Sequence, residues 1–396
     1  MPTLDSLLLP QIQDIKQKEL DWKVYKLEGA SLPHAIVNGK KVLMLGTNNY
    51  LGLSNHPKLK EAAIEAVKKY GAGSGSVRTI SGTMDLHIKL EETIARFKRT
   101  DAAIYFQTGF AANQGTLPQL LAEGDLAISD ELNHGSIIDG VRLSKAEKAI
   151  YKHCDMDDLA TKLEAAAKSG KYKKIFIITD GVFSMDGDIA PLDRIQRLAE
   201  TYEAYIHVDD AHGDGVLGSH GRGIVDHFKL EGKIESEMGT FSKGFGVVGG
   251  FVAGSSVLKE FLHNKARSYL LSGSAPPATV AACIASLELL ESDDTLVKQM
   301  WENTAYFKEK LKKMGFDTGN SGTPITPIMI GDSPKAKQFS AELFKEGVFA
   351  LPIVFPMVAQ GKARVRTQIR ADFTREDLDF ALGACERVGQ KLQLIK

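Results

Sequence analysis

The chain has 396 residues, of which 43% are hydrophobic and 25% charged, and 49 basic against 50 acidic side chains leave a formal net charge of -1. This composition is typical of a globular protein, and the length allows roughly two to three domains. The balanced charge argues against a nucleic-acid or membrane-surface partner. The three cysteines, Cys154, Cys283 and Cys385, form no C-x-x-C pair, so we expect reduced thiols and no disulfide framework.

The N-terminal segment lacks a basic leader, an apolar core and a cleavage site, and no run approaches the ~18 apolar residues that cross a bilayer. We therefore expect a cytoplasmic protein without a membrane partner. Residues 11–28 have the pattern of a polar helix, which predicts an N-terminal arm over residues 1–44.

Residues 57–70 begin with proline, have helical apolar spacing and end before Gly71, which predicts a helix. From there, short apolar runs alternate with helical stretches. The expected strands are residues 102–107, 125–129, 174–180, 204–210 and 249–254, and the helices between them include 155–169 and 191–203. Buried strands separated by helices predict an α/β fold with a doubly wound, mostly parallel sheet.

Towards the C-terminus, a strand candidate at residues 362–369 is flanked by helical patterns at 334–347 and 374–393. This predicts a small α+β domain. The expected organisation is therefore an arm over residues 1–44, a large domain over 45–284 and a small domain over 285–396.

Polar clusters follow three of the predicted strands, namely TGF (108–110), DGVFSMDG (180–187) and DDAHG (209–213). In open α/β sheets, ligands bind beyond the carboxyl ends of the strands. Three polar strand ends that meet at one edge therefore predict a binding site.

Asp209 and Lys243 are the residues in these clusters that best suit cofactor chemistry. A carboxylate at a strand end can pair with a protonated ring nitrogen and keep a pyridinium charged, although Asp209 also fits a simple helix cap. Lys243 lies among small residues in GTFSKGFGVVGG (239–250), where burial would favour the neutral amine that attacks an aldehyde. Most lone lysines are solvated, so Lys243 needs partners to be meaningful.

A phosphate group would find partners nearby. TGFAANQG (108–115) opens a helix whose first amides can bind a phosphate, and Thr240 precedes Lys243 by three residues. A plain strand-to-helix turn is the alternative for residues 108–115. The glycine-rich residues 71–83 fit neither the dinucleotide nor the P-loop pattern, which favours a packed turn beside the site.

His134 and Arg366 are weaker candidates. A flat imidazole could stack on a cofactor ring, but a histidine near a helix start is more often structural. A guanidinium suits the carboxylate of an amino acid, or forms a routine salt bridge. No metal is expected, because His207 and His212 have no paired ligands and no serine elbow, HExxH or EF-hand pattern occurs.

Together these motifs resemble the α-oxoamine synthase family, the pyridoxal-phosphate (PLP) dependent acyl-CoA:amino-acid C-acyltransferases. The resemblance implies the fold type I aminotransferase architecture, PLP as cofactor, and a homodimer with active sites shared between subunits. The matching segments run in order along nearly the whole chain: TNNYLGLSNHP (47–57), GSVRTISGT (75–83), TGFAANQG, SDELNHGSIIDG (129–140), DGVFSMDGDIAPL (180–192), VDDAHG (208–213), GTFSKGFGVVGG and GKARVRTQ (361–368).

The resemblance also implies roles for single residues. Lys243 would hold PLP as a Schiff base and then take the α-proton of the substrate. Asp209 would pair with the ring nitrogen, His134 would stack on the ring, and His212 would lie near its phenolic oxygen. The remaining implied cofactor contacts are Gly109, Phe110, Ser184 and Thr240, with Ser274 from the partner subunit, and the implied substrate contacts are Asn48, His134, Ser184 and Arg366.

The implied reaction condenses an amino acid with an acyl-CoA to an α-amino-β-keto acid and CoA. Residues 76–83, 324–334 and 361–368 resemble the 2-amino-3-ketobutyrate CoA ligase (glycine C-acetyltransferase) branch, so glycine and a short acyl-CoA, with acetyl-CoA favoured, are the expected substrates. GTFSK also resembles 8-amino-7-oxononanoate synthase and serine palmitoyltransferase, which leaves a longer acyl-CoA open. Further alternatives are an aminotransferase or aldolase and a noncatalytic regulatory subunit, and the presence of Lys243 and Asp209 argues against the last.

Five positions depart from the pattern of the family. Phe373 stands where histidine is common, and Gly273 replaces a threonine or serine, which would weaken a phosphate contact from the partner. The other departures are Arg370, Pro352 and Ala359. These positions concern the choice of substrate and leave Lys243 untouched.

Overall fold

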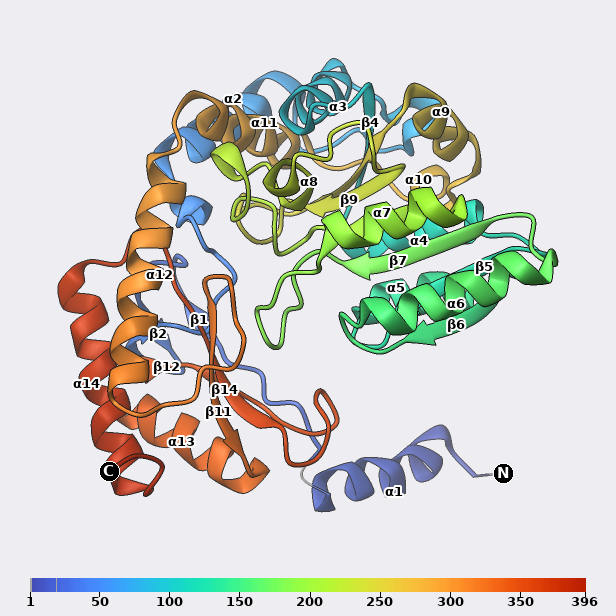
Figure 1. Cartoon of the computed structure of the whole chain (residues 1–396). Helices are drawn as coiled ribbons and strands as arrows, with labels where there is room; N and C mark the ends of the chain where they lie inside the picture. Colours follow the sequence, from blue (N-terminus) through green and yellow to red (C-terminus); the bar gives the residue numbers. More distant parts are fainter. Residues whose placement is uncertain (1, 19) are drawn as a thin grey trace.

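A seven-stranded sheet forms the centre of the protein in a computed structural model that describes residues 2–18 and 20–396 (Figure 1). Its strands lie in the order β4-β10-β9-β8-β7-β5-β6. β10 runs antiparallel to β4 and β9, and the pairs from β9 to β6 are parallel. The bounds are β4 Ala102–Phe106, β5 Leu126–Asp130, β6 Glu147–Tyr151, β7 Ile175–Asp180, β8 Tyr205–Asp209, β9 Ser236–Thr240 and β10 Gly250–Gly254. The predicted mostly parallel α/β sheet is confirmed.

Five of these strands coincide with the expected ones, whereas β6 and β9 were not expected. β6 is an edge strand with exposed charged residues, so it lacks a continuous apolar run. β9 has the sequence SEMGT and is buried throughout. Its polar side chains find partners inside the protein, since Ser236 bonds His207 and Glu237 pairs with Lys98. Hydropathy alone cannot identify such a strand.

Helices cover both faces of this sheet because successive strand residues point to opposite sides. Ile128 and Ile177 pack with helices α3, α6, α7 and α11, and Ala127 and Ile178 pack with α4 and α5. The helices of this part are α2 Pro57–Tyr70, α3 Asp85–Lys98, α4 Gly109–Leu120, α5 Gly135–Arg142, α6 Met156–Ser169, α7 Leu192–Tyr202, α8 Ile224–Phe228, α9 Ser256–Lys265, α10 Arg267–Leu270 and α11 Pro277–Ser292. The predicted helices at 57–70, 155–169 and 191–203 correspond to α2, α6 and α7.

The C-terminal part builds a second core around two small sheets, at the lower left of Figure 1. β3 pairs in parallel with β12, which brings Leu43 and Leu45 into this core. How the chain divides into domains at residues 44 and 284 stays a prediction. The elements are β1 Leu27–Glu28, β2 His34–Val37, β3 Lys40–Met44, β11 Ile325–Gly331, β12 Val348–Phe349, β13 Leu351–Ile353, β14 Ala363–Gln368, α12 Thr295–Lys313, α13 Ser333–Lys345 and α14 Arg375–Lys391.

The expected helix over residues 11–28 is wrong in its position. Helix α1 spans Leu4–Gln17, and residues 20–26 form no regular element. The helix begins early because the Thr3 side chain accepts the Ser6 amide and so caps its first turn. No residue of α1 is buried, and the helix lies apart from the body in Figure 1.

Membrane-spanning segments were searched for among the described residues. None of their helices combines the length and the apolarity that crossing a bilayer requires.

Candidate active site

The carboxyl ends of five strands meet at one edge of the large sheet, as the polar strand ends predicted. β5, β7 and β8 each end on an aspartate, and Asp180 is paired with Asp209 in the sheet register. β4 leads into Gly109, and β9 leads into the turn that carries Lys243. The sheet therefore brings together residues that are more than a hundred positions apart in the sequence.

Lys243 lies in a tight turn between two buried rings. Phe241 and Phe245 are fully buried and pack at 5.2 Å, which fixes the chain on both sides of the lysine. Gly246 has φ +73, and a Cβ there would meet the Ser54 backbone nitrogen at 2.5 Å, so the turn requires glycine. Burial lowers the pKa of Lys243 to about 8, against the attraction of Asp209 and Asp180. A substantial fraction of the amine is thus neutral near pH 7.5.

Asp209 is buried at the end of β8 with both oxygens held. Its Oδ2 accepts a hydrogen bond from Asn113 Nδ2 at 2.7 Å, and its Oδ1 accepts one from the Ala211 amide at 3.0 Å. The aspartate therefore caps a turn with one oxygen only. Its second oxygen is oriented from α4, a contact that a simple capping role does not need.

Both candidate histidines are held by hydrogen bonds to Nδ1. The Ser136 amide donates to His134 Nδ1 at 3.2 Å, and Tyr50 Oη lies 2.8 Å from His212 Nδ1. Burial lowers the pKa of His134, and it lowers that of His212 well below the ordinary value, with Lys243 adding to the effect in both cases. The two rings are therefore neutral at physiological pH. The His134 ring is only partly covered by protein, so one part of it stays exposed at the site.

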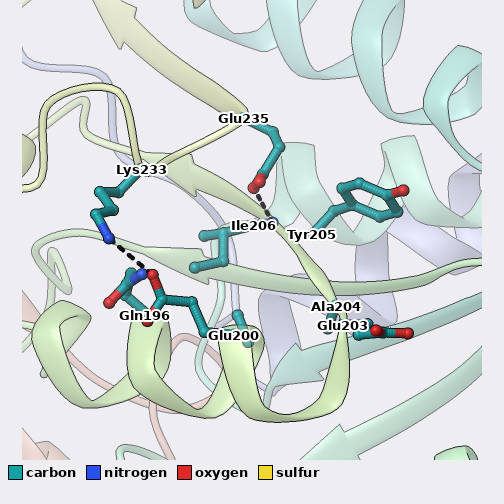
Figure 2. Close-up of a pocket in the computed structure, with 9 residues that line it drawn as sticks. Gln196, Glu200, Glu203, Ala204, Tyr205, Ile206, Lys233 and Glu235 are labelled. Atoms are coloured by element: carbon teal, nitrogen blue, oxygen red, sulfur yellow. Dashed lines mark hydrogen bonds and ion pairs between the residues drawn. The ribbon is translucent and has the colours of Figure 1, made fainter.

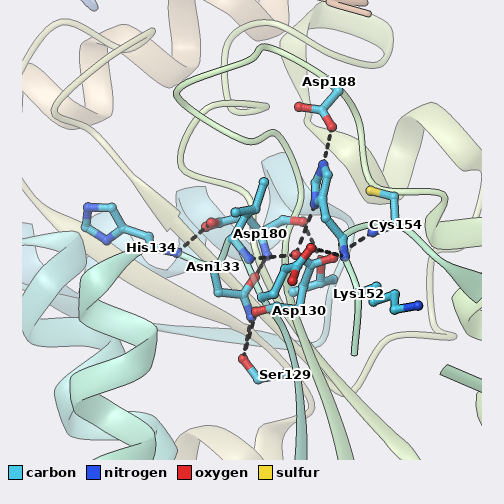
Figure 3. A network of polar contacts seen from close by, with 12 residues as sticks. Ser129, Asp130, Asn133, His134, Lys152, Cys154, Asp180 and Asp188 are labelled. Carbon is cyan, nitrogen blue, oxygen red and sulfur yellow. Dashed lines mark hydrogen bonds and ion pairs between the residues drawn. The ribbon is translucent and has the colours of Figure 1, made fainter. Parts of the chain in front are cut away.

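The loop of His134 is fixed from β7, as Figure 3 shows. Asp180 Oδ2 accepts the His134 amide at 2.7 Å, and Asn133 Oδ1 accepts the Asp180 amide at 2.7 Å. Asn133 also donates to Ser129 and to the Ile178 carbonyl. His134 is thus a helix N-cap whose position is set by the neighbouring strand.

A phosphate cradle lies at the start of α4. The first backbone hydrogen bond of this helix is donated by Ala112 to the Thr108 carbonyl, so the amides of Gly109 and Phe110 precede it. A Cβ on Gly109 would come within 3.3 Å of the Thr240 side chain, so the glycine leaves space between the two. These amides fit a phosphate. The Thr240 hydroxyl borders the same space but donates to the Gly249 carbonyl at 2.7 Å, so it would have to turn to donate to a phosphate.

Residues 71–83 lie against the segment of Ser274. The Ser274 amide donates to the Ser76 carbonyl at 3.0 Å, and the Ser274 and Ser74 hydroxyls lie 2.6 Å apart. Part of this segment, Arg78–Gly82, is a π-helix, a rare geometry that is frequent near functional sites. The role of Ser274 towards a partner subunit stays a prediction.

The residues expected to bind substrate come together from three segments. Arg366 Nη1 donates to the Ser184 carbonyl at 2.8 Å, and Gln368 Nε2 donates to Asn48 Oδ1 at 2.5 Å. Arg366 and Gln368 lie two apart on β14 and so point to the same side. Among the described residues, Arg366 forms no ion pair with a carboxylate, whereas Arg364 pairs with Asp186. Arg366 therefore keeps its charge available.

The departures from the family pattern lie mainly in the second core. Phe373 is buried in it, and the charge of Arg370 is matched by Asp372 at 2.6 Å. Pro352 pairs with Val365 in the β13–β14 ladder. A Cβ at Gly273 would meet nothing within 4 Å, so glycine there is not required by packing within this chain.

Sequence reasoning missed four residues that shape the site, namely Asn113, Tyr50, Asp180 and Gln368. Each lies inside or next to a motif that was noted for another residue. Nothing in the sequence signals that Tyr50 meets His212, 162 positions later, or that Asn113 meets Asp209, 96 positions later.

A hollow of about 260 Å³ lies away from this edge, beside α7 and the start of β8 (Figure 2). Lys233 pairs with Glu200 across it at 2.8 Å, and Glu235 accepts the Ile206 amide. It lies near Tyr205, at the amino end of β8, whereas Asp209 lies at the carboxyl end. We assign this hollow no part in the site.

One group among the described residues has metal-ligand spacing, formed by Asp130, His153 and Cys154. Both nitrogens of His153 are engaged by carboxylates, with Asp130 at 3.0 Å and Asp188 at 2.5 Å. The arrangement is that of an imidazolium between two carboxylates, which ties the loop after β6 to the end of β5 and to residues 181–190.

Comparison with known proteins gives the family. The model for class I and II aminotransferases matches residues 40–384. The chain belongs to this family. It is 53% identical to the 8-amino-7-oxononanoate synthase of Thermoanaerobacter pseudethanolicus over 385 residues, covering 97% of both proteins, and 51% identical to 8-amino-7-oxononanoate synthase 1 of Bacillus subtilis over 388 residues, covering 98% of both. Within the family it is an α-oxoamine synthase, an acyl-transferring enzyme.

Solved structures agree. A serine palmitoyltransferase of Sphingomonas wittichii matches with a TM-score of 0.94 at 30% identity over the whole of both chains. An 8-amino-7-oxononanoate synthase of Francisella tularensis matches with a TM-score of 0.76 at 28% identity, covering 89% of this chain and 99% of that one. The fold type I architecture and PLP as cofactor are thereby confirmed, and Lys243, Asp209, His134 and the cradle at Gly109 fit that group. The expected glycine C-acetyltransferase branch is not supported, because these relatives carry other names.

Proposed function

We propose that the protein is an 8-amino-7-oxononanoate synthase that condenses alanine with a seven-carbon dicarboxylic acyl thioester. The observation that carries the proposal is 50–53% identity to enzymes of that name over nearly the whole chain, with the cofactor residues of the site in place. The serine palmitoyltransferase structure has a higher TM-score than the 8-amino-7-oxononanoate synthase structure of Francisella tularensis, but its sequence is only 30% identical to this chain. The longer acyl thioester, which the sequence left open, therefore replaces glycine and acetyl-CoA as the proposed substrate choice.

The substrates follow from the product that gives these relatives their name. Condensation of this type joins the acyl carbon of a thioester to the α-carbon of an amino acid, and the amino acid then loses its carboxyl group as CO2. In 8-amino-7-oxononanoate, the amine on C8 and the methyl C9 correspond to alanine without its carboxyl group. Carbons 1–7 are then an acyl group that ends in a second carboxylate.

The side chains of the site divide this task. When bound, PLP supplies a ring that accepts electrons from a carbanion at the α-carbon. Asp209 would keep the ring nitrogen protonated, and the neutral ring of His134 would lie on its face. Arg366 would bind the carboxylate of the amino acid in a fork. Lys243 Nζ, with its pKa lowered to about 8, would take the α-proton as a base near neutral pH.

The assembly belongs to the same proposal. Large apolar side chains are exposed around the phosphate end of the site: Ile80 is 81% exposed, Leu271 66% and Phe110 44%. Apolar surface of this kind marks an interface. We assign it to a second copy of the chain, in a homodimer whose partner contributes Ser274.

The test is the rate of thiol release over a matrix of substrates. The purified holoenzyme is given alanine, glycine or serine, each with the seven-carbon dicarboxylic thioester, acetyl-CoA or palmitoyl-CoA. Alanine with the dicarboxylic thioester should react fastest, by about tenfold or more over glycine, because a site shaped for one methyl discriminates by that order. Mass spectrometry should identify the nine-carbon amino ketone.

The same matrix contains the results that would overturn the proposal. Fastest release from glycine with acetyl-CoA would assign a glycine C-acetyltransferase, and fastest release from serine with palmitoyl-CoA would assign a serine palmitoyltransferase. The Lys243→Ala variant is the control for thioester hydrolysis and should release no thiol above background.

A further inference from the structure

A chain of buried hydrogen bonds reaches Asp209 along the face of the sheet that α4 covers. His207 on β8 lies with Nδ1 2.9 Å from Ser236 Oγ and Nε2 3.1 Å from Asn113 Oδ1. Asn113 Nδ2 then donates to Asp209 Oδ2 at 2.7 Å. Ser236, His207 and Asn113 are completely buried, and Asp209 is 3% exposed. None of these contacts is made at the surface, where water could replace them.

The direction of each bond in this chain is determined. A carboxamide oxygen can only accept, so His207 Nε2 carries the proton that it donates to Asn113 Oδ1. Burial lowers the pKa of His207 to about 4, so the ring is neutral and its Nδ1 accepts from the Ser236 hydroxyl. Every donor thus points towards the Asp209 carboxylate. Such an ordered chain polarises its last member, here the amide that faces the carboxylate.

Asn113 has a second branch that ends at His134. Its Nδ2 also donates to Ser136 Oγ at 2.9 Å, and Ser136 Oγ lies 2.8 Å from His134 Nδ1. The Ser136 amide donates to the same ring nitrogen, so His134 is neutral with its proton on Nε2. One carboxamide on α4 therefore contacts, directly or through one hydroxyl, the two side chains assigned to the edge and the face of the cofactor ring.

We propose that Asn113, held in its orientation by His207 and Ser236, is a positioning residue that fixes Asp209 and His134 for the ring of the cofactor. If the carboxamide turned over, its oxygen would face the Asp209 carboxylate, and the bond from His207 prevents this. His207 thereby acts on the cofactor without touching it. The inference rests on the assignment of Asp209 as the partner of the ring nitrogen.

The experiment measures the affinity of the apoprotein for PLP in three variants. His207→Leu removes the donor to Asn113 at similar volume, His207→Gln keeps a donor at the same place, and Asn113→Asp puts a second carboxylate against Asp209. PLP binding should weaken by up to about tenfold in His207→Leu, the upper end of the scale of one hydrogen bond between neutral groups, and should recover in His207→Gln. Asn113→Asp should weaken binding more and shift the visible absorption of the bound cofactor.

A matched control separates positioning from stability. Asn303 is another buried asparagine, and its Nδ2 donates to the carbonyls of Arg370 and Phe373 in the second core. Asn303→Asp should lower the thermal midpoint of the apoprotein while its PLP affinity, measured well below that midpoint, stays unchanged. Equal PLP affinity in His207→Leu and the wild type would overturn the proposal, even if the variant melts earlier.

The assignment of Asp209 has its own control. Asp209→Asn should weaken PLP binding and alter the visible band more than any change at His207. If Asp209→Asn leaves both unchanged while His207→Leu does not, the assignment of Asp209 fails. Ser236→Ala tests the order of the hydrogen-bond chain. It should weaken PLP binding less than His207→Leu does, because Ser236 is one bond further from Asp209. A loss of PLP affinity larger than that of Asn113→Asp would contradict this order.

Discussion

At the scale of single residues, the environment of Lys243 sets the pH range in which the apoprotein can bind PLP covalently. With a pKa of about 8, roughly a tenth of the amine is neutral at pH 7, against a few parts in ten thousand at the ordinary value of 10.5. The rate of appearance of the visible band after PLP is added should rise about tenfold per pH unit below 8 and level off above it. Stopped-flow absorbance over pH 6.5–10 checks this, and a rise that continues past pH 10 would contradict it.

Tyr50 makes a second residue-scale prediction. Its hydroxyl is buried against His212 Nδ1, and donation there leaves the proton of the ring on Nε2. Tyr50→Phe removes the donor but little volume, so His212 can exchange between its two neutral forms. We expect PLP affinity to fall several-fold, by the scale of one buried hydrogen bond, with the fold retained. Tyr306→Phe, which removes a hydroxyl bonded to Asp379 far from the site, should leave the affinity unchanged.

The sequence identified the residues whose chemistry is unusual and missed those that act through position. A lysine among glycines and an aspartate at a strand end follow from what an aldehyde and a ring nitrogen need. Asn113 and Tyr50 have ordinary side chains, and their roles arise from contacts between segments that only the folded sheet brings together. Such contacts carry no local pattern that a reading along the chain could detect.

At the scale of elements, the hairpin of residues 181–190 links the sheet to β14. The bridge between Val182 and Ile189 closes it, and Ser184 within it accepts Arg366. His153 holds its far end through Asp188 and stacks edge-on against Phe183 at 4.3 Å. The strands and helices around this hairpin were largely predictable from apolar spacing. The hairpin was not, because ion pairs with His153 and Arg364, which lie far away in the sequence, help to hold it and leave no periodic pattern along the chain.

His153→Asn should therefore weaken substrate binding without stopping the chemistry. Although burial opposes the charge, hydrogen bonds from His153 to Asp130 and Asp188 raise its pKa to about 12. We expect the KM for the amino acid to increase several-fold, with kcat less affected, because the hairpin would no longer hold Arg366 in place. Steady-state kinetics with varied amino acid measures this, and a fall in kcat alone would contradict it.

The raised pKa of His153 also predicts how stability depends on pH. The folded state holds the proton up to about pH 12 and the unfolded state loses it near 6.5, so the stabilisation is complete below 6.5 and declines as pH rises. The difference in thermal midpoint between the wild type and His153→Asn should thus be larger at pH 6 than at pH 9. His227→Asn serves as the control, since burial lowers the pKa of that histidine and its removal should cost no more at pH 6 than at pH 9.

At the scale of the whole molecule, apolar side chains are exposed at the surface near the place where the cofactor phosphate would lie. Leu271 lies three residues before Ser274, and Ile80 lies within Arg78–Gly82. Both are among the most exposed apolar side chains of the described chain. A homodimer through this face would bury them and place the cofactor site next to the partner. Assembly and cofactor retention should therefore depend on each other.

Leu271→Asp tests that dependence. A carboxylate buried at an interface without a partner costs several kcal/mol, enough to weaken dimerisation by orders of magnitude. We expect sedimentation velocity to show monomer at micromolar concentration, and the same sample to lose PLP on gel filtration. Ile150→Asp is the matched control, because Ile150 is 64% exposed on the edge strand β6, at the other end of the sheet from β4. If Leu271→Asp stays dimeric, the interface does not include this face. If it becomes monomeric yet keeps its PLP as well as Ile150→Asp does, a cofactor site completed by the partner subunit is ruled out.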